Sequence, residues 1–317
     1  MIYAKVTMCE PKEKSCSELM IEELPKARFW EAVDIVRWEG FWFRAASVKP
    51  AMTFRSSFTA RNDDVLLASS MKTGTTWLKS LALSCNRRNG GADDPLATEN
   101  PHFLVPTVEV EQFIKKPCKI DVYDASAPRL LHTHLPYSLL PDSIKSSSSS
   151  SKIVYIVRNP KDTLISMWHF WSSNLRPLPL EKAVDSFCSG VHIFGSFFDH
   201  VAEYWIESRK RPEKILFLKY EELKNNPKAE VMKMAEFMGK ALGSEDEVEK
   251  ILWRCSLERL SNLEVNKTGE RALWHLSNSS FFRKGKVGDW KNYLTPEMVE
   301  KIDQLSRDKH ETIGLFL

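Results

Sequence analysis

The stretch of sequence that decides the fold spans residues 65–79. It runs Val65-Leu66-Leu67-Ala68-Ser69-Ser70-Met71-Lys72-Thr73-Gly74-Thr75-Thr76-Trp77-Leu78-Lys79. The apolar run 65–68 predicts a buried strand, and helical spacing from Trp77 predicts a helix. The polar turn between them contains a lysine, three threonines and a glycine. Such a turn attracts anions, because the first amides of a helix lack partners and carry partial positive charge.

The order of residues separates this turn from the phosphate loop of many kinases and ATPases. That loop places Gly-Lys-Ser/Thr at the start of its helix, after an earlier glycine. Here Lys72 precedes Gly74, and the Lys-Ser/Thr pair that helps to hold Mg²⁺ is missing. The turn therefore predicts a phosphate site without the usual Mg²⁺ machinery, and an ordinary strand–turn–helix is the simpler alternative.

Composition excludes several classes of protein. The 317 residues are 43% apolar, enough for a packed core, and a net charge of +3 with dispersed Lys and Arg argues against nucleic-acid binding. No segment has the apolar run of a signal peptide or of a membrane span, which needs ~18 residues. The six cysteines are never spaced Cys-x-x-Cys, which argues against zinc and disulfides. We expect a cytoplasmic protein that binds neither nucleic acid nor membrane.

Apolar runs and helical patterns alternate along the chain. Strands are predicted at Val65–Ala68, Arg129–His132, Ile153–Val157 and Ile215–Leu218, and helices at Trp77–Cys85, Thr163–Trp171, Ile193–Ser208 and Glu230–Met238. This alternation predicts an α/β fold in which helices flank a central parallel sheet. We expect a loose N-terminal lead-in at residues 1–25 and a single domain at 26–317.

Candidate site residues follow the predicted strands. Lys72, His134 and Arg158 stand at or just past strand ends, where α/β folds bind their ligands. The planar fork of Arg158 suits a phosphate, and Ser166 would add a hydroxyl donor. The glycines of Arg283-Lys284-Gly285-x-x-Gly288 would let backbone amides approach an anion. Two separate anion sites suit a nucleotide that carries phosphate at both ends of its ribose.

Two polar segments also predict local structure. Six serines at 146–151 predict an exposed loop. Residues 262–280 predict either a mobile cover over bound nucleotide or a surface loop.

Several motifs in register resemble those of the plant cytosolic sulfotransferases. Besides the turn at 72–76, they are Arg158-Asn159-Pro160-Lys161-Asp162 with Ser166, Phe282-Arg283-Lys284-Gly285-x-x-Gly288-Asp289-Trp290, Arg129 to Tyr137, Gly40-Phe41-Trp42 and Pro101-His102-x-Leu104-Val105-Pro106. The resemblance implies a sulfotransferase that moves a sulfuryl group from 3′-phosphoadenosine 5′-phosphosulfate to a small hydroxylated acceptor, with a phosphosulfate loop similar to a P-loop.

The resemblance also assigns roles to residues. It implies that Lys72, Thr73, Gly74, Thr75 and Thr76 bind the 5′-phosphosulfate. The remaining nucleotide contacts that it implies are Trp77, stacking on adenine, with Arg158, Ser166, Tyr220, Ser256, Arg283, Lys284 and Gly285. Phe281 matches an aromatic beside the adenine, with plain packing as an equal alternative.

Catalysis would fall to His134 and Lys72. His134 belongs to the Thr-His-x-Pro motif and would take the acceptor proton as general base, while Lys72 would stabilise charge on the leaving oxygens. No metal is implied. Phe103 and Phe170, with Phe41 or Trp42 nearby, match positions of an apolar acceptor pocket, although each could be core. Flavonols, steroids, desulfoglucosinolates and hydroxyjasmonates all stay open as acceptors.

Three positions depart from the family pattern. Met71 replaces a usual proline, His132 stands where animal members have lysine, and Pro296 replaces the valine of a short dimer motif at 291–300. The last departure favours a monomer. A small-molecule kinase and a non-catalytic nucleotide-binding protein are the alternative functions.

Overall fold

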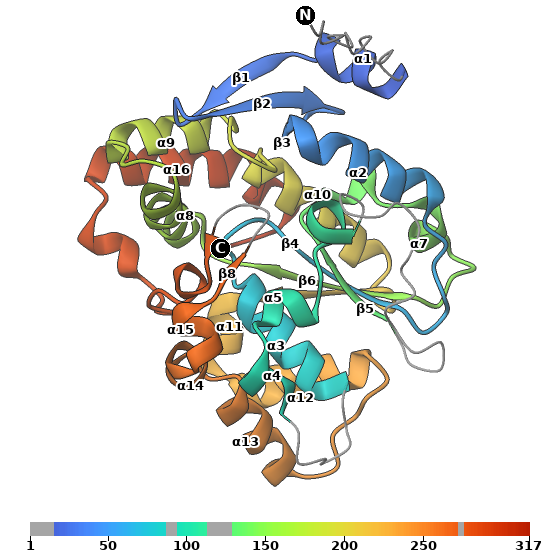
Figure 1. Ribbon diagram of the computed structural model, residues 1–317. Helices are drawn as coiled ribbons and strands as arrows, with labels where there is room; N and C mark the ends of the chain where they lie inside the picture. The colour runs from blue at the N-terminus through green and yellow to red at the C-terminus, as the bar shows by residue number, and fades with distance from the viewer. Residues whose placement is uncertain (1–15, 87–93, 113–128, 272–275) are drawn as a thin grey trace, which may run out of the picture.

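The computed structural model describes residues 16–86, 94–112, 129–271 and 276–317 (Figure 1). Its centre is a parallel sheet of β4 (Val65–Ser69), β5 (Leu130–Thr133), β6 (Lys152–Val157) and β7 (Ile215–Lys219). The strands lie in the order β5-β4-β6-β7, and every neighbouring pair is parallel. The predicted α/β fold with a central parallel sheet is confirmed, and the four predicted strands match to within one residue at each end.

Alternation along the strands divides the core into two layers. In β6, for example, Ile153 and Tyr155 pack into one apolar cluster, and Val154 and Ile156 pack into another. The first cluster includes residues of α2 (Ala45–Ser57), α8 (Pro160–Asn174), α9 (Leu180–Cys188), α10 (Phe197–Lys210) and α16 (Pro296–Lys309). The second includes residues of α3 (Thr75–Asn86), α12 (Pro227–Phe237) and α13 (Glu245–Arg254). Figure 1 shows the sheet between these two groups of helices.

Two helices begin at residues other than those predicted, because capping residues determine where they start. Helix α8 begins at Pro160 because the side chain of Asn159 accepts a hydrogen bond from the amide of Lys161. Helix α10 begins at Phe197 instead of Ile193, because Ser196 caps it by accepting from the amide of Asp199. Apolar periodicity finds the middle of a helix, and these caps set its end.

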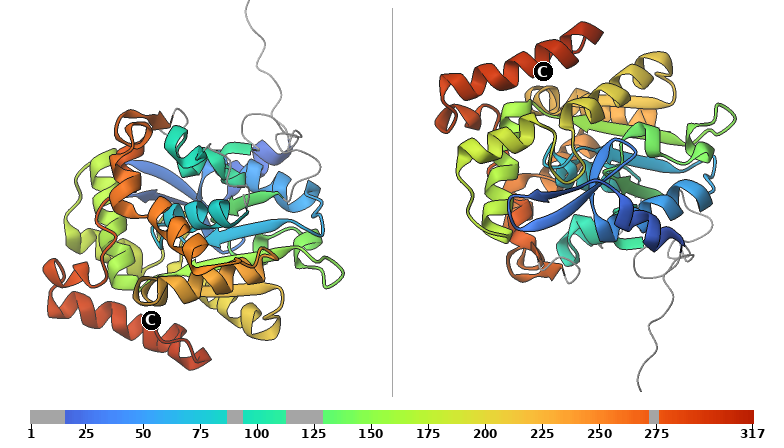
Figure 2. Two further views of the ribbon diagram at one scale, coloured as in Figure 1. Left: turned by 90° about the horizontal axis from the view of Figure 1, so that it is seen from below. Right: turned by 90° about the horizontal axis from the view of Figure 1, so that it is seen from above.

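An antiparallel sheet near the N-terminus was not predicted. Strands β1 (Lys26–Phe29), β2 (Val33–Trp38) and β3 (Phe41–Arg44) form it, and it lies at one side of the molecule beside α2 (Figures 1 and 2). Helix α1 (Cys16–Glu23) occupies part of the segment expected to be loose, and residues 1–15 lie outside the described residues. The signal for β2 was weak, because its burial alternates imperfectly and over only six residues.

Shorter elements complete the described chain. They are α4 (Pro95–Thr98), α5 (Pro101–Leu104), α7 (Asp142–Lys145), α11 (Tyr220–Asn225), α14 (Leu257–Asn262), α15 (Glu264–Thr268), β8 (Glu270–Arg271) and β9 (Leu276–Ser277). The serine run 146–151 is a loop, as predicted, although Ser151 is buried. The described part of 262–280, residues 262–271 and 276–280, is more structured than a surface loop, because buried Asn266 accepts a hydrogen bond from Asn100 beside α5 at 2.8 Å.

None of the helices in the described ranges has the length and apolar character that a membrane crossing requires.

Candidate functional site

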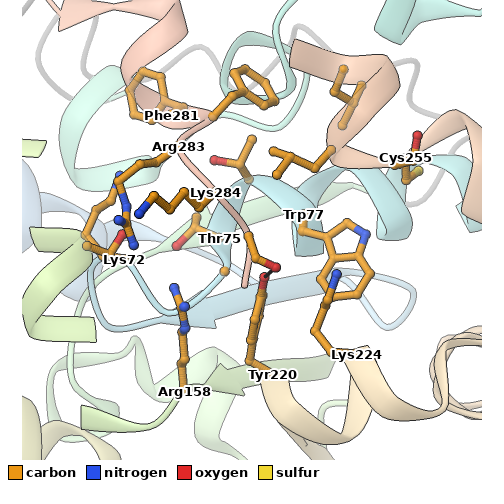
Figure 3. Close-up of a pocket in the computed structure, with 18 of the residues that line it drawn as sticks. Lys72, Thr75, Trp77, Arg158, Tyr220, Lys224, Cys255, Phe281, Arg283 and Lys284 are labelled. Carbon is orange, nitrogen blue, oxygen red and sulfur yellow. Dashed lines mark hydrogen bonds between the residues drawn. The ribbon is translucent and has the colours of Figure 1, made fainter. Parts of the chain in front are cut away.

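A cavity of about 330 Å³ opens beyond the carboxyl ends of β4, β5 and β6. Lys72, His134 and Arg158 all line it. His134 and Arg158 each follow the last residue of a strand, and Lys72 follows β4 by three residues. The fold therefore brings together the three residues that the sequence placed at strand ends. Side chains from α8, α11, α14 and the segment 281–285 close the cavity (Figure 3).

The turn between β4 and α3 needs an unusual backbone. Lys72 has φ +66°, a left-handed value that a side-chain-bearing residue adopts only under constraint, and Gly74 has φ +113°. A Cβ on Gly74 would lie 2.8 Å from the ring of Tyr220. Gly74 is therefore required both for the turn and for the close approach of α11. The hydroxyl of Thr73 points inward and donates to the carbonyl oxygens of Ser70 and Ile156, so it holds the turn instead of lining the cavity.

Lys72 lies among aromatic rings and other cations. Its Nζ is 3.9 Å from the ring centroid of Phe170 and 5.6 Å from that of Phe281. Burial, reinforced by the charges of Arg283 and Arg158, lowers the pKa of Lys72 to about 7. A bound anion would favour the protonated ammonium.

A second group of cations faces Lys72. Figure 3 shows Arg283 and Lys284 beside Lys72, with Arg158 extending toward them from the other side of the pocket. Arg283 and Lys284 both pair with Asp289, at 2.5 and 3.0 Å. Together these side chains form an electropositive wall with one carboxylate behind it.

Asp162 fixes the backbone of this wall. It is fully buried, and its two oxygens accept from the amides of Gly288 at 2.7 Å and Trp290 at 3.1 Å. Arg158 lies 3.6 Å from the same carboxylate and donates to the carbonyl oxygen of Lys286 at 2.6 Å. Asp162 of helix α8 therefore lies beside the cavity-lining Arg158 and also anchors the segment 286–290.

The other end of the cavity is flat and aromatic. Trp77 and Tyr220 meet edge to face with ring centroids 5.5 Å apart, and Nζ of Lys224 lies 5.5 Å from the Trp77 ring. Tyr220 also donates to the carbonyl oxygen of Gly285 at 3.0 Å. Ser256 lines the cavity and caps α14 by accepting from the amide of Arg259. Such a face can hold a planar heterocycle.

His134 also lines the cavity. Its Nδ1 lies 2.8 Å from the carbonyl oxygen of Ser69, so Nδ1 carries the proton and Nε2 carries the lone pair. Burial, together with the charges of Lys79 and Lys72, lowers the pKa of His134 to about 3, so the ring is neutral at physiological pH. His132 is fully buried and does not line the cavity.

Most of the predicted site residues line one cavity, and two do not. Besides those above, Thr75, Thr76, Ser166 and Phe170 line it. Thr73 lies behind the turn, and Phe103 is half exposed and away from the cavity. His102, Lys224 and Cys255 line it without having been predicted. His102 belongs to a motif quoted for its resemblance alone, and nothing in its spacing indicated a role.

The residues present fit a doubly phosphorylated nucleotide. The Nε atoms of Arg158 and Arg283 are buried without a hydrogen-bond partner in the described structure. Buried guanidinium donors of this kind are costly unless a ligand accepts from them. Among the described residues, no group of three or more His, Cys, Asp or Glu side chains could hold a metal ion.

The cradle after β4 and the cation wall define a nucleotide-dependent transferase site, and comparison with known proteins identifies the class. A sulfotransferase domain model matches residues 62–314, and the chain belongs to this family. It is 40% identical to cytosolic sulfotransferase 5 of Arabidopsis thaliana over 94% of this chain and 95% of the relative. It is 41% identical to cytosolic sulfotransferase 16 of the same plant, over 98% and 95%.

Solved structures agree with this assignment. A crystal structure of an Arabidopsis thaliana sulphotransferase has a TM-score of 0.75 at 33% identity, with 94% of both chains covered. Mouse sulfotransferase SULT7A1 complexed with PAP has a TM-score of 0.72 at 30% identity, covering 88% of this chain and 96% of the mouse chain. The chain is therefore a sulfotransferase that uses a nucleotide of the 3′-phosphoadenosine 5′-phosphosulfate type. The names of the plant relatives support the predicted cytoplasmic location.

Proposed function

We propose that this protein transfers the sulfuryl group of 3′-phosphoadenosine 5′-phosphosulfate to a hydroxyl of a small lipophilic or phenolic acceptor, with His134 as general base. The observation that carries the proposal is the position of His134 in the same cavity as Lys72, with its lone pair on Nε2. A neutral imidazole can take the acceptor proton as the acceptor oxygen attacks sulfur. The negative charges of the bound donor would raise the pKa of His134 and strengthen it as a base.

The donor would lie across the cavity with its 5′ end at the turn 72–76. Lys72 and the first amides of α3 would stabilise the charge that develops on the leaving phosphate oxygen. Arg158, Ser166 and Arg283 would hold the 3′-phosphate, and Trp77 would stack on the adenine.

The acceptor would approach from the apolar side of His134. Met71 and Phe170 line the cavity, and their surfaces favour a lipophilic body behind the reacting hydroxyl. Phe103 is half exposed and is not among the residues that line the cavity, so it has no acceptor contact in this scheme. We further propose a monomer, because Pro296 stands where the dimer motif has valine. Pro296 is the first residue of α16, and Thr295 caps that helix.

His134→Ala tests the proposal. Transfer of labelled sulfate to a panel of phenols and hydroxysteroids should fall ~10²–10⁴-fold, because the general base is gone. Affinity for 3′,5′-bisphosphoadenosine should stay within about threefold, since His134 holds no phosphate in this scheme. A variant that retains its transfer rate would exclude His134 as the base. Absence of transfer by the unmodified protein, despite tight nucleotide binding, would favour a non-catalytic binding function.

A further inference from the structure

A buried lysine lies directly behind the phosphate turn. Lys79 follows Thr75 by four residues on α3, is fully buried, and is not among the residues that line the cavity. Its Nζ lies 2.9 Å from Oγ1 of Thr107 and 3.2 Å from Nδ1 of His102. In its charged form Lys79 has three protons and no lone pair, and it is then the donor in both contacts.

The contact between Lys79 and His102 determines the proton positions as far as Thr76. Because Nδ1 of His102 accepts from Lys79, the ring proton of neutral His102 sits on Nε2. That atom lies 2.9 Å from Oγ1 of Thr76, so His102 donates and Thr76 accepts. The hydroxyl proton of Thr76 is then directed away from His102, and Thr76 lines the cavity.

The contact between Lys79 and Thr107 leads to Thr75 through a longer chain of hydrogen bonds. Thr107 accepts from Lys79 and lies 3.1 Å from Nδ1 of His132. With one of its lone pairs taken by the ammonium, Thr107 is favoured to donate its own proton to that Nδ1. Burial lowers the pKa of His132 far below its ordinary value, so the ring is neutral. In this arrangement its single proton sits on Nε2, 2.9 Å from Oγ of Ser69, and Ser69 is left to donate to Oγ1 of Thr75 at 2.7 Å. Thr75 also keeps its own proton for the cavity that it lines.

We propose that Lys79 is a positioning residue that sets the direction of both hydrogen-bond chains, so that Thr75 and Thr76 each present a hydroxyl proton to the 5′-phosphosulfate of the donor. The inference rests on the proposed placement of that end of the donor at the turn. Donors that are already oriented need no rearrangement when the anion binds. Without the ammonium, either chain can reverse and present a hydroxyl lone pair to the anion.

A buried carboxyl group, Glu109, feels the positive charge of Lys79. Glu109 is fully buried and accepts from the amide of His134 at 2.6 Å and from the hydroxyl of Thr133 at 2.8 Å. Burial raises the pKa of Glu109 to about 7, and the positive charge of Lys79 opposes this rise. A buried ammonium near a carboxyl group that it helps to ionise can remain protonated.

The first experiment replaces Lys79 with the uncharged methionine and compares two nucleotides by calorimetry. Lys79→Met should weaken 3′,5′-bisphosphoadenosine ~10–100-fold, because it affects two hydrogen bonds to a charged group. Adenosine 3′-monophosphate, which has no 5′-phosphate, should change less than about threefold. Lys214→Met is the matched control, because Lys214 is also buried but bonds to the serine loop. It should leave the ratio of the two affinities unchanged.

Three outcomes are distinguishable. If the unmodified protein binds the two nucleotides equally, the proposed donor placement fails. If the unmodified protein discriminates and Lys79→Met keeps the same ratio, the placement stands and the role of Lys79 is overturned. A loss for the bisphosphate alone supports the role.

A second experiment does not depend on the folding of Lys79→Met. Thr107→Val removes one hydroxyl at constant shape and interrupts the route to Thr75, while the contact of Lys79 with His102 remains. It should weaken the bisphosphate by about tenfold in the unmodified background and have no effect in a Thr75→Val background. Nitrogen-15 NMR of the unmodified protein should place the ring protons of His102 and His132 on Nε2. A proton on Nδ1 of His102, or additive losses in the double variant, would overturn the proposal.

Discussion

At the residue scale, the site combines cations with few counter-charges. Lys72 has a pKa of about 7, because it is buried near Arg283 and Arg158. The carboxylates near these arginines, Asp162 and Asp289, are already engaged with the segment that carries the wall. Nucleotide phosphates would supply the missing negative charge, so ligand binding and protonation of Lys72 are coupled.

This coupling predicts a pH dependence of nucleotide binding. Above pH 7, free Lys72 has lost its proton, and the bound phosphates favour its return, so affinity for 3′,5′-bisphosphoadenosine should fall as pH rises. The slope should approach ~10-fold per pH unit between pH 7 and about pH 9, because one proton is taken up. Calorimetry in buffers of different ionisation enthalpy measures that proton directly. Lys72→Met should bind more weakly at pH 7 and lose the slope, and an unchanged slope in this variant would assign the proton to another group.

At the element scale, the start of helix α8 supports the part of the cavity where we propose the 3′-phosphate. Arg158 precedes the helix, and Asp162 anchors the amides of Gly288 and Trp290. The cavity on this side therefore depends on one carboxylate that contacts no ligand in our scheme.

Asp162→Asn tests this anchor. The amide keeps the shape of the carboxylate but turns one acceptor into a donor that faces a backbone N–H. The free energy of unfolding should fall by ~1–3 kcal/mol, because one buried amide loses its acceptor. Binding of 3′,5′-bisphosphoadenosine should weaken more than binding of 5′-AMP. Asp199→Asn is the control, since its partially exposed pair with Lys309 should contribute less than ~1 kcal/mol. Equal losses for both nucleotides would contradict a specific role for this anchor at the 3′ end.

The sequence predicted the strands of the central sheet better than the side-chain contacts behind the site. Strands β4 to β7 were predictable, because each contains an apolar run and most of its residues are buried. Strand ends then placed Lys72, His134 and Arg158 correctly. The roles of Lys79 and His102 were not predictable, because their partners lie 28 and 26 residues away in sequence, at Thr107 and Thr76 respectively. Pairings of that kind exist only after the sheet has formed.

The antiparallel sheet shows another limit of sequence reasoning. The four-residue strands β1 and β3 are too short for a clear period, and β3 is apolar at Phe41, Trp42 and Phe43 without alternation. Tertiary packing against the loop before α10 determines β3 instead, since Trp42 exchanges backbone hydrogen bonds with Phe194 and Gly195. Local propensity contains no information about such a partner.

At the scale of the whole molecule, the cavity and a buried ion pair lie at opposite ends of the parallel strands. The cavity lies at their carboxyl ends. At the amino edge, Arg129 and Asp64 form an ion pair at 2.5 Å, with both side chains more than nine-tenths buried. Arg129 also donates to the carbonyl oxygen of Thr59, and Asp64 accepts from the amide of Arg61. This cluster joins the starts of β4 and β5 to the segment that follows α2.

Arg129→Met should therefore destabilise the fold and spare the chemistry. Removing the guanidinium leaves Asp64 as a buried charge without its partner, which typically costs ~3–5 kcal/mol in the free energy of unfolding. Adding Asp64→Asn should recover part of this loss, because the amide carries no charge. Arg28→Met, whose partner Asp34 is 91% exposed, should cost less than ~1 kcal/mol. Urea titrations measure all three variants. At temperatures where Arg129→Met stays folded, its transfer rate should match that of the unmodified protein, since the pair lies at the far end of the strands from His134. A folded variant with a strongly reduced rate would show that the two edges of the sheet are coupled.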